Sequence, residues 1–399
     1  MGTHRAPRLT AGLLAVLSFL AAVGPFATDM YLASFTSIAR DLGAQPSSVQ
    51  LTLTAFLFGM GIGQLLLGPL SDQVGRRPVI VTGLAVFAAS SIAMAFSPNI
   101  EIFIALRAVQ GLSGAAGVVV SRAIAVDLAK GADAIRAISL IAMFVGLGPL
   151  IAPPVGGAIL TVGDWRAVLG TLAGIALAMF LLAAFVVPES LPKSARAASG
   201  LRTSLRNFGL LLANRRFLLL TVVFGLGFGS MMAYISASPF VGQVVLGMPP
   251  FLYSLAFAAG ALAMILANMT NARLAGRVPP QRMLMIGACL SLASGAILTV
   301  TSIGGLLTPA LFIVCAFALT GGTGLIMSNA SALALSLAEE ARGSGSALLG
   351  AAQFAVGGLA SPIVGAWGEH TALPMALFVL AASLLSTAGA LLYLLRTRS

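Results

Sequence analysis

Apolar runs long enough to cross a membrane follow one another along nearly the whole chain. A helix needs about 20 residues to span the hydrocarbon of a bilayer. Only 8% of the 399 residues are charged, whereas a soluble domain carries about 25%. We therefore predict an all-α membrane protein. Its expected spans are 9–36, 47–70, 77–97, 101–126, 135–162, 166–188, 216–242, 250–272, 281–303, 307–337, 343–367 and 371–395.

The net charge of +11 follows the connections between these runs. Basic residues gather in the even-numbered connections and at the termini, whereas the odd-numbered connections carry only Arg40 and Arg166. Positive charge stays on the cytoplasmic side of a membrane, so we expect both termini in the cytoplasm. Because topology explains the charge, no nucleic-acid partner is implied.

The longest polar stretch divides the chain into two sets of six spans. We predict an N-terminal bundle (1–188), a cytoplasmic linker (189–215) and a C-terminal bundle (216–399), an arrangement typical of repeat-built transporters. In the linker, Leu201, Leu205, Phe208 and Leu212 recur at helical spacing. They favour a short amphipathic helix on the membrane surface, with a flexible linker as the alternative. The basic, then apolar start resembles a secretory signal, but the run continues toward Ala39, which favours a retained first helix.

The connection after the second span reads GPLSDQVGRRP. It combines glycines that permit tight turning with an acid and two basic residues, namely Gly68, Asp72, Gly75, Arg76 and Arg77. This stretch resembles the signature loop of the major facilitator superfamily, with Gln73 in place of the usual arginine. The resemblance implies two bundles of the major facilitator fold, latched by this loop in the outward-facing state. Asp72 would meet a helix end of the C-terminal half, and Arg76 would pair with Asp127.

The fifth span contains GLGPLIAPPVGG, a run of helix-breaking residues that neighbouring helices must support. Its Gly148, Pro149, Pro153, Gly156 and Gly157 resemble the antiporter motif of drug-exporting facilitators; a packing kink is the alternative. ATDMYLASF (27–35), LRAVQGLSGAAG (106–117) and MMAYISASPFVG (231–242) are similar to the first, fourth and seventh helices of the bicyclomycin/chloramphenicol-resistance (Bcr/CflA) branch. This resemblance implies drug:proton antiport in a bacterial cell (inner) membrane.

Asp29 is an acid well inside an expected span, while the other acids lie at or near span ends. An ionised aspartate at the centre of a membrane helix costs about 2.5–3.5 kcal/mol on insertion scales. Arg107 lies at a similar depth in the fourth span, so the two charges would face a shared cavity and Asp29 would carry the transported proton. In the resembled branch an acid here titrates and the arginine modulates it. The alternatives are an orienting Asp29–Arg107 ion pair or two unconnected charges.

Further polar and aromatic side chains inside the expected spans are candidates for substrate contacts. They are Tyr31, Gln110, Tyr234, Ser236, Ser238, Phe240, Asn268, Asn329 and Gln353. Aromatic rings can stack on a solute, and hydroxyl or amide groups can bond one. Arg107, Gln110, Gly111, Gly114 and Gly117 form a polar, small-residue stripe that would line the cavity. Hydrogen bonding between helices is the alternative for each polar group.

The sequence lacks the patterns of an enzyme. It contains no Walker loop, no metal-ligand cluster and no Ser–His–Asp set within the spans. We expect no enzymatic activity, cofactor or metal, and a monomer that interacts with the bilayer, protons and a small-molecule drug. The predicted function is proton-coupled efflux of chloramphenicol-like or bicyclomycin-like compounds. Alternatives are export of an endogenous metabolite or sugar on the same fold, and a non-transporting membrane sensor.

Overall fold

A computed structural model of the protein describes residues 9–129, 132–193, 196, 208–338, 342–365 and 370–398. Within these residues, 12 helices are long and apolar enough to cross a membrane, which confirms the predicted fold class. Residues 197–207, which include most of the predicted amphipathic linker helix, lie outside the described residues.

The first six spans build one bundle. They are α1 (Ala11–Ala21), α2 (Val23–Asp29) and α3 (Phe35–Asp41), which together form span one, followed by α4 (Pro46–Val74), α5 (Arg76–Ala95), α6 (Ile100–Leu128), α7 (Ala132–Ile159) and α8 (Trp165–Phe185). The last six build the other. They are α10 (Arg215–Phe240), which continues as a π-helical turn (Val241–Val245), α11 (Pro250–Leu274), α12 (Pro280–Ile303), α13 (Pro309–Ser336), α14 (Arg342–Gly365) and α15 (Leu373–Arg398).

Local sequence signals begin many of these helices. The side chains of Thr10, Asn99 and Asp164 accept backbone N–H bonds at the starts of α1, α6 and α8. Each satisfies a donor that has no partner within its own helix. Proline occupies the first turn of α4, α11, α12 and α13, where its missing N–H costs nothing.

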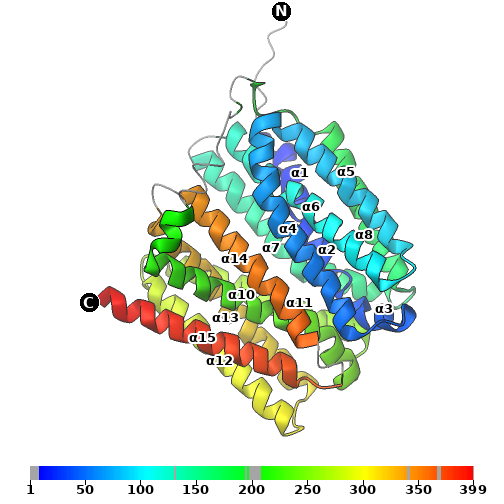
Figure 1. The fold of residues 1–399 in the computed structure, drawn as a ribbon, viewed down its shortest axis with the longest axis vertical. Helices are drawn as coiled ribbons and strands as arrows, with labels where there is room; N and C mark the ends of the chain where they lie inside the picture. The colour runs from blue at the N-terminus through cyan, green and yellow to red at the C-terminus, as the bar shows by residue number, and fades with distance from the viewer. Residues whose placement is uncertain are drawn as a thin grey trace, which may run out of the picture.

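The two bundles repeat one packing pattern. In the first, α6 packs against α4 and α5, and α5 packs against α8; in the second, α13 packs against α11 and α12, and α12 packs against α15. The bundles meet through α4 against α14 and α7 against α11. Figure 1 shows the two groups of helices side by side, with α4, α7, α10, α11 and α14 toward their junction.

Span one is broken, although the sequence predicts a continuous helix. The chain first bends at Ala22, where α1 ends. Pro25 has no N–H to bond the carbonyl four residues earlier, which accounts for this break. A second break follows Asp29, where α2 ends and a 3₁₀ turn (Leu32–Ser34) leads into α3. Asp29 therefore lies at the end of a helix, within the first membrane-length span.

The two bundles are tied together at one end. We call the end where α1 begins and α15 ends the terminal side, and the opposite end the far side (Figure 1). On the far side Thr36 donates to Gln243 (2.8 Å), and Gln243 donates to the Ala33 carbonyl (3.0 Å). Thr54 of α4 donates to the Gly358 carbonyl of α14 (2.9 Å). These contacts close the far side.

Candidate functional site: the central cavity

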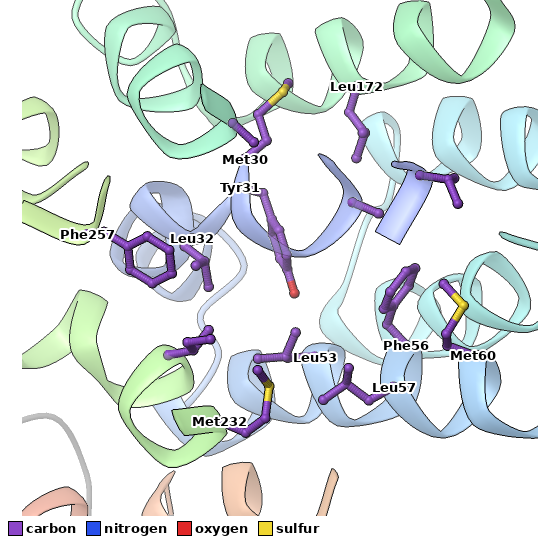
Figure 2. Close-up of a cluster of buried hydrophobic side chains, with 14 of the residues drawn as sticks. Met30, Tyr31, Leu32, Leu53, Phe56, Leu57, Met60, Leu172, Met232 and Phe257 are labelled. Carbon is purple, nitrogen blue, oxygen red and sulfur yellow. The ribbon is translucent and has the colours of Figure 1, made fainter. Parts of the chain in front are cut away.

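A cavity of about 610 Å³ lies between the two bundles. Both bundles contribute to its wall, and the wall is mainly apolar. Phe56 and Met60 come from the first bundle, and Phe228, Met232 and Phe257 from the second. Figure 2 shows Met232 beside Leu53 of α4, and Phe257 beside Leu32 of span one. Methionine and aromatic side chains form a surface that adapts to differently shaped apolar solutes.

Asp29 is part of the cavity wall and is only 5% exposed. The Thr28 hydroxyl donates to its Oδ1 atom (2.8 Å). The acids that form ion pairs between described residues are Asp41, Asp72, Asp127, Asp133 and Glu189. Asp29 therefore has no cationic partner among the described residues. A buried carboxylate without a cation is destabilised when ionised.

Arg107 is separated from Asp29, contrary to the expectation of a shared cavity. Its guanidinium donates to the Ala27 carbonyl (3.0 Å), the Gln110 side chain (2.5 Å) and the Tyr31 hydroxyl (3.0 Å). It also lies 4.4 Å from the ring centres of both Tyr31 and Phe56. Arg107 is 1% exposed and is absent from the cavity wall. These contacts join span one, α4 and α6.

The small-residue stripe of α6 packs helices together and does not line the cavity. A Cβ atom added to Gly111 would overlap the Phe56 carbonyl of α4, and one on Gly117 would lie 2.6 Å from the Leu20 carbonyl of span one. Close backbone approach explains these glycines, as in other membrane helix pairs. The expectation that this stripe faces the cavity is therefore revised.

Three of the polar or aromatic candidates lie in the cavity wall. They are Tyr234 of α10, Asn268 of α11 and Gln353 of α14. The Tyr234 ring stacks on Phe257, with ring centres 6.0 Å apart and an interplanar angle of 12°. All three belong to the second bundle, opposite Asp29.

The other candidates are engaged in contacts outside this wall. Figure 2 shows the Tyr31 ring with its hydroxyl directed toward α4, where it lies 2.9 Å from Thr52 Oγ1. Gln110 donates to Ser91 (2.8 Å). Ser238 lies 2.8 Å from the Tyr253 hydroxyl, and Asn329 donates to Asn271 (3.0 Å). The Phe240 ring packs on Phe35, and Ser236 bonds the Ala233 carbonyl. These side chains form contacts within or between helices, which was the alternative to substrate contact.

Arg122 is a cavity residue that the sequence interpretation missed. It belongs to α6, lines the cavity and is exposed there. An arginine inside an expected span is itself a signal, because ionisable residues in spans face the bundle interior or a water-filled cavity. Arg122 and Asp29 are the two charged residues among the described residues of the wall.

The loop between α4 and α5 forms a charged cluster on the terminal side. Gly75 takes a φ of 113°, a conformation that favours glycine. Arg76 pairs with Asp72 (2.5 Å) and with Asp127 of α6 (3.0 Å), so the Arg76–Asp127 contact that the resemblance implied is present. Asp72 makes its described ion pair within its own bundle, and its side chain is 48% exposed.

Residues after α8 complete this cluster, and the sequence interpretation did not include them. Glu189 accepts the Arg76 backbone N–H (2.9 Å), and so stabilises the start of α5. Ser190 donates to Asp127 (2.8 Å). Arg77 donates to the Ala184 carbonyl (2.7 Å), and Gly68 packs near Val119. An acid just after a membrane helix, in the sequence PES, was the available signal.

The glycines of the predicted antiporter motif allow α7 to pack closely on two neighbours. A Cβ added to Gly148 would overlap the Pro25 ring, and one on Gly156 would overlap the Met30 carbonyl, next to Asp29. A Cβ on Gly157 would lie 2.8 Å from Ser254 Cβ in α11 of the other bundle. Pro149 lies in the cavity wall, and α7 continues through Pro153. The motif thus connects the Asp29 segment with the junction between the bundles.

Comparisons with known proteins agree with this architecture. The chain is 37% identical over 363 residues to the "Uncharacterized MFS-type transporter YdgK" of Bacillus subtilis, covering 90% of each chain. It is 34% identical to the "Bicyclomycin resistance protein homolog" of Haemophilus influenzae, covering 92% of this chain and 90% of that protein. It is 32% identical to a "Chloramphenicol resistance protein" of Pseudomonas aeruginosa, covering 74% and 68%.

A solved structure shares the fold at low sequence identity. It is a bacterial homologue of the human lysosomal transporter Spinster in an inward-facing, unoccupied conformation, with a TM-score of 0.77, 13% identity and 97% of each chain covered. Residues 17–362 match the family description "Major Facilitator Superfamily". With 12 membrane-length helices in two bundles around a cavity, the chain is a multi-pass membrane protein that belongs to the major facilitator superfamily.

Proposed function

We propose that this protein exports small amphiphilic antibiotics, such as chloramphenicol-like or bicyclomycin-like compounds, in exchange for protons. The relatives named for bicyclomycin and chloramphenicol resistance support this substrate class. The mainly apolar cavity has a few polar groups, including Tyr234, Asn268 and Gln353. Such a wall suits a ligand that buries an apolar body and forms a few hydrogen bonds.

Asp29 carries the proposal of proton coupling. It combines a buried carboxylate, a position in the cavity wall and the lack of a cationic partner among the described residues. An acid in such surroundings is more stable in its protonated, neutral form than in its ionised form. Cargo that fills the cavity beside Asp29 would occupy the space through which a proton reaches the carboxylate. Proton and drug therefore compete for one region of the cavity.

Transport would proceed by alternating access between the two sides. The distribution of basic residues assigns the terminal side to the cytoplasm, so the closed far side corresponds to an inward-facing state. Cargo enters from the cytoplasm, the bundles rock, and the far side opens. The cluster around Arg76 and Asp127 would then meet the second bundle and hold the outward-facing state.

The proton gradient supplies enough free energy for this exchange. One proton that crosses a potential of 100 mV releases about 2.3 kcal/mol. That free energy sustains roughly a fifty-fold gradient of a neutral drug. Asp29 is the one carboxylate among the described residues of the cavity wall, so one proton per cycle is the simplest stoichiometry.

The test uses purified protein in proteoliposomes with radiolabelled chloramphenicol. An imposed pH gradient should drive accumulation by the wild type. Asp29→Asn should abolish accumulation but retain exchange of labelled for unlabelled drug at equal pH, because asparagine keeps the size and loses the proton. Asp133→Asn is the matched control, since Asp133 is an exposed acid 3.6 Å from Arg136 outside the cavity wall.

Two results would contradict the proposal. Gradient-driven accumulation by Asp29→Asn at the wild-type rate would remove Asp29 as the coupling site. Wild-type accumulation that ignores the pH gradient would remove proton coupling altogether.

A further inference from the structure

Arg122 presents a positive charge to the part of the cavity nearer the terminal side. It lies six residues before the end of α6, and Gln64 of α4 and Ser346 of α14 line the same cavity. Nothing in the proposed proton exchange requires a cation at this position. Basic residues that only orient a membrane protein belong in the loops, whereas Arg122 is inside a helix.

No described residue neutralises this charge. The ion pairs of the described residues use Arg76, Arg136, Arg166 and Arg196. Arg122 is in none of them, and no hydrogen bond joins it to another described side chain or carbonyl. Arg107 on the same helix, by contrast, has three hydrogen-bond acceptors. The five N–H donors of Arg122 are therefore available to a solute in the cavity.

Asp29 is too far away to act as the missing partner. Gly117 of α6 packs against Leu20 of span one and fixes the relative level of the two helices. From that contact, Asp29 lies nine residues toward the far side, about 13 Å at the helical rise, and Arg122 lies five residues toward the terminal side, about 7 Å. The two opposite charges are thus about 20 Å apart along the cavity, at two separate levels.

We propose that Arg122 binds an anionic group of the cargo, so that the cavity accepts amphiphiles bearing a carboxylate, sulfonate or phosphonate as well as neutral ones. This inference rests on the proposed function and adds a substrate class to it. A guanidinium matches the geometry of such groups through two parallel hydrogen bonds. The apolar body of the cargo then lies along the wall toward Phe354 and Met327, which belong to the same cavity.

The separation of the two charges also assigns them different roles: Arg122 would bind the anionic group, and Asp29 would bind the transported proton. Arg122 stays protonated at all physiological pH values, so its own charge does not depend on the proton at Asp29. Protonation of Asp29 removes the negative charge of the wall and leaves Arg122 as its charged residue among those described. The loaded cavity then electrostatically favours anionic over cationic cargo.

The test compares two probes that differ by one carboxylate. Chloramphenicol is neutral, and its hemisuccinate ester carries an added anionic group. Equilibrium binding of each labelled compound to the full-length protein in lipid nanodiscs does not require a proton gradient. Arg122→Ala should weaken binding of the ester about 10- to 100-fold, as expected for loss of a hydrogen bond to a charged group, and change chloramphenicol binding less than about twofold.

Two variants control for charge and for folding. Arg122→Lys keeps the charge without the paired geometry, so the ester should bind with intermediate affinity. Arg136→Ala removes an exposed arginine that pairs with Asp133 outside the cavity wall, and it should change neither affinity. Equal thermal unfolding midpoints would show that each variant is folded.

The outcomes separate this inference from the function on which it rests. If the wild type binds chloramphenicol and Arg122→Ala binds the ester as tightly as the wild type does, the anion site alone is overturned. Equal losses for both probes also overturn it, because the arginine would then act on the cavity as a whole. Wild type that binds neither probe overturns the proposed drug class and the anion site with it.

Discussion

Gly157 offers a steric test of how the two bundles close. It faces α11 of the other bundle, where an added Cβ would overlap the Ser254 hydroxyl oxygen and lie 2.8 Å from Ser254 Cβ and 3.3 Å from Phe251 Cα. Carbon atoms reach favourable contact at about 3.5 Å, so relief of the Cβ–Cβ contact alone requires Gly157→Ala to separate the helices locally by at least about 0.7 Å. Ser254 cannot easily yield, because it is fully buried and its hydroxyl bonds the Pro250 carbonyl (2.8 Å).

The cost of this overlap falls on one conformational state. Overpacking by a methyl group costs about 1–3 kcal/mol. The α7–α11 contact at this level is part of the closed far side, so opening that side relieves the overlap. A difference of about 1–3 kcal/mol changes a two-state equilibrium about 5- to 150-fold. Gly157→Ala should therefore shift the population toward a far-side-open state.

Distances between spin labels on the far side would measure this shift. Val162→Cys and Val245→Cys place labels on the two bundles at positions that are 90% and 37% exposed. Cys289 and Cys315 are first replaced so that only the labels react. Gly157→Ala should add a population at longer distance. Gly174→Ala is the matched control, because an added Cβ there meets nothing within 4 Å.

An unchanged distance distribution in folded Gly157→Ala would refute this reasoning. The α7–α11 contact would then either persist in both states or absorb the methyl group without cost. Equal shifts in Gly157→Ala and Gly174→Ala would also contradict it, since helix propensity and not contact would be the cause.

Three further substitutions probe the other contacts. Gln243→Ala removes hydrogen bonds to Thr36 and to the Ala33 carbonyl; at about 0.5–1.5 kcal/mol each, their loss should also populate the open far side in the same label experiment, and no change would exclude them as a gate. Arg107→Ala removes three hydrogen bonds and the contact of the guanidinium with two aromatic rings. We expect the free energy of unfolding to fall by about 2–5 kcal/mol, measured as a lower thermal unfolding midpoint in detergent. An unchanged midpoint would contradict the structural role of Arg107. Arg76→Ala leaves Asp127 without its arginine partner; drug binding should persist while transport slows at least about tenfold (~1.4 kcal/mol), and full transport would rule out a latch at this loop.

The sequence alone determined the membrane-spanning architecture, because it follows from hydropathy. Every backbone polar group in the bilayer core must be satisfied within the protein, so the long apolar runs became helical, span one with two breaks. Helix starts such as Pro46, Pro280 and Pro309 follow from local chemistry. Asp29 could also be found in this way, since a lone acid inside an apolar run requires a polar cavity or a partner.

Only the tertiary structure decided which side chains share the cavity. Residue spacing defines the face of a helix, but packing against neighbours decides whether that face meets another helix or the cavity. The stripe from Arg107 to Gly117 met helices, whereas Val118 and Arg122 met the cavity. Tyr31 lies two residues from Asp29, about 200° around a helix, and bonds Arg107 behind the wall.

The breaks in span one were likewise only partly predictable from the sequence. Pro25 is visible in the sequence, but the 3₁₀ turn at Leu32–Ser34 lies between two long-range contacts, that of Met30 with Gly156 and that of Phe35 with Phe240. Those contacts join residues more than 100 positions apart. The apolar pattern therefore determined which segments cross the membrane, and long-range packing decided how each helix is rotated and where its charges point.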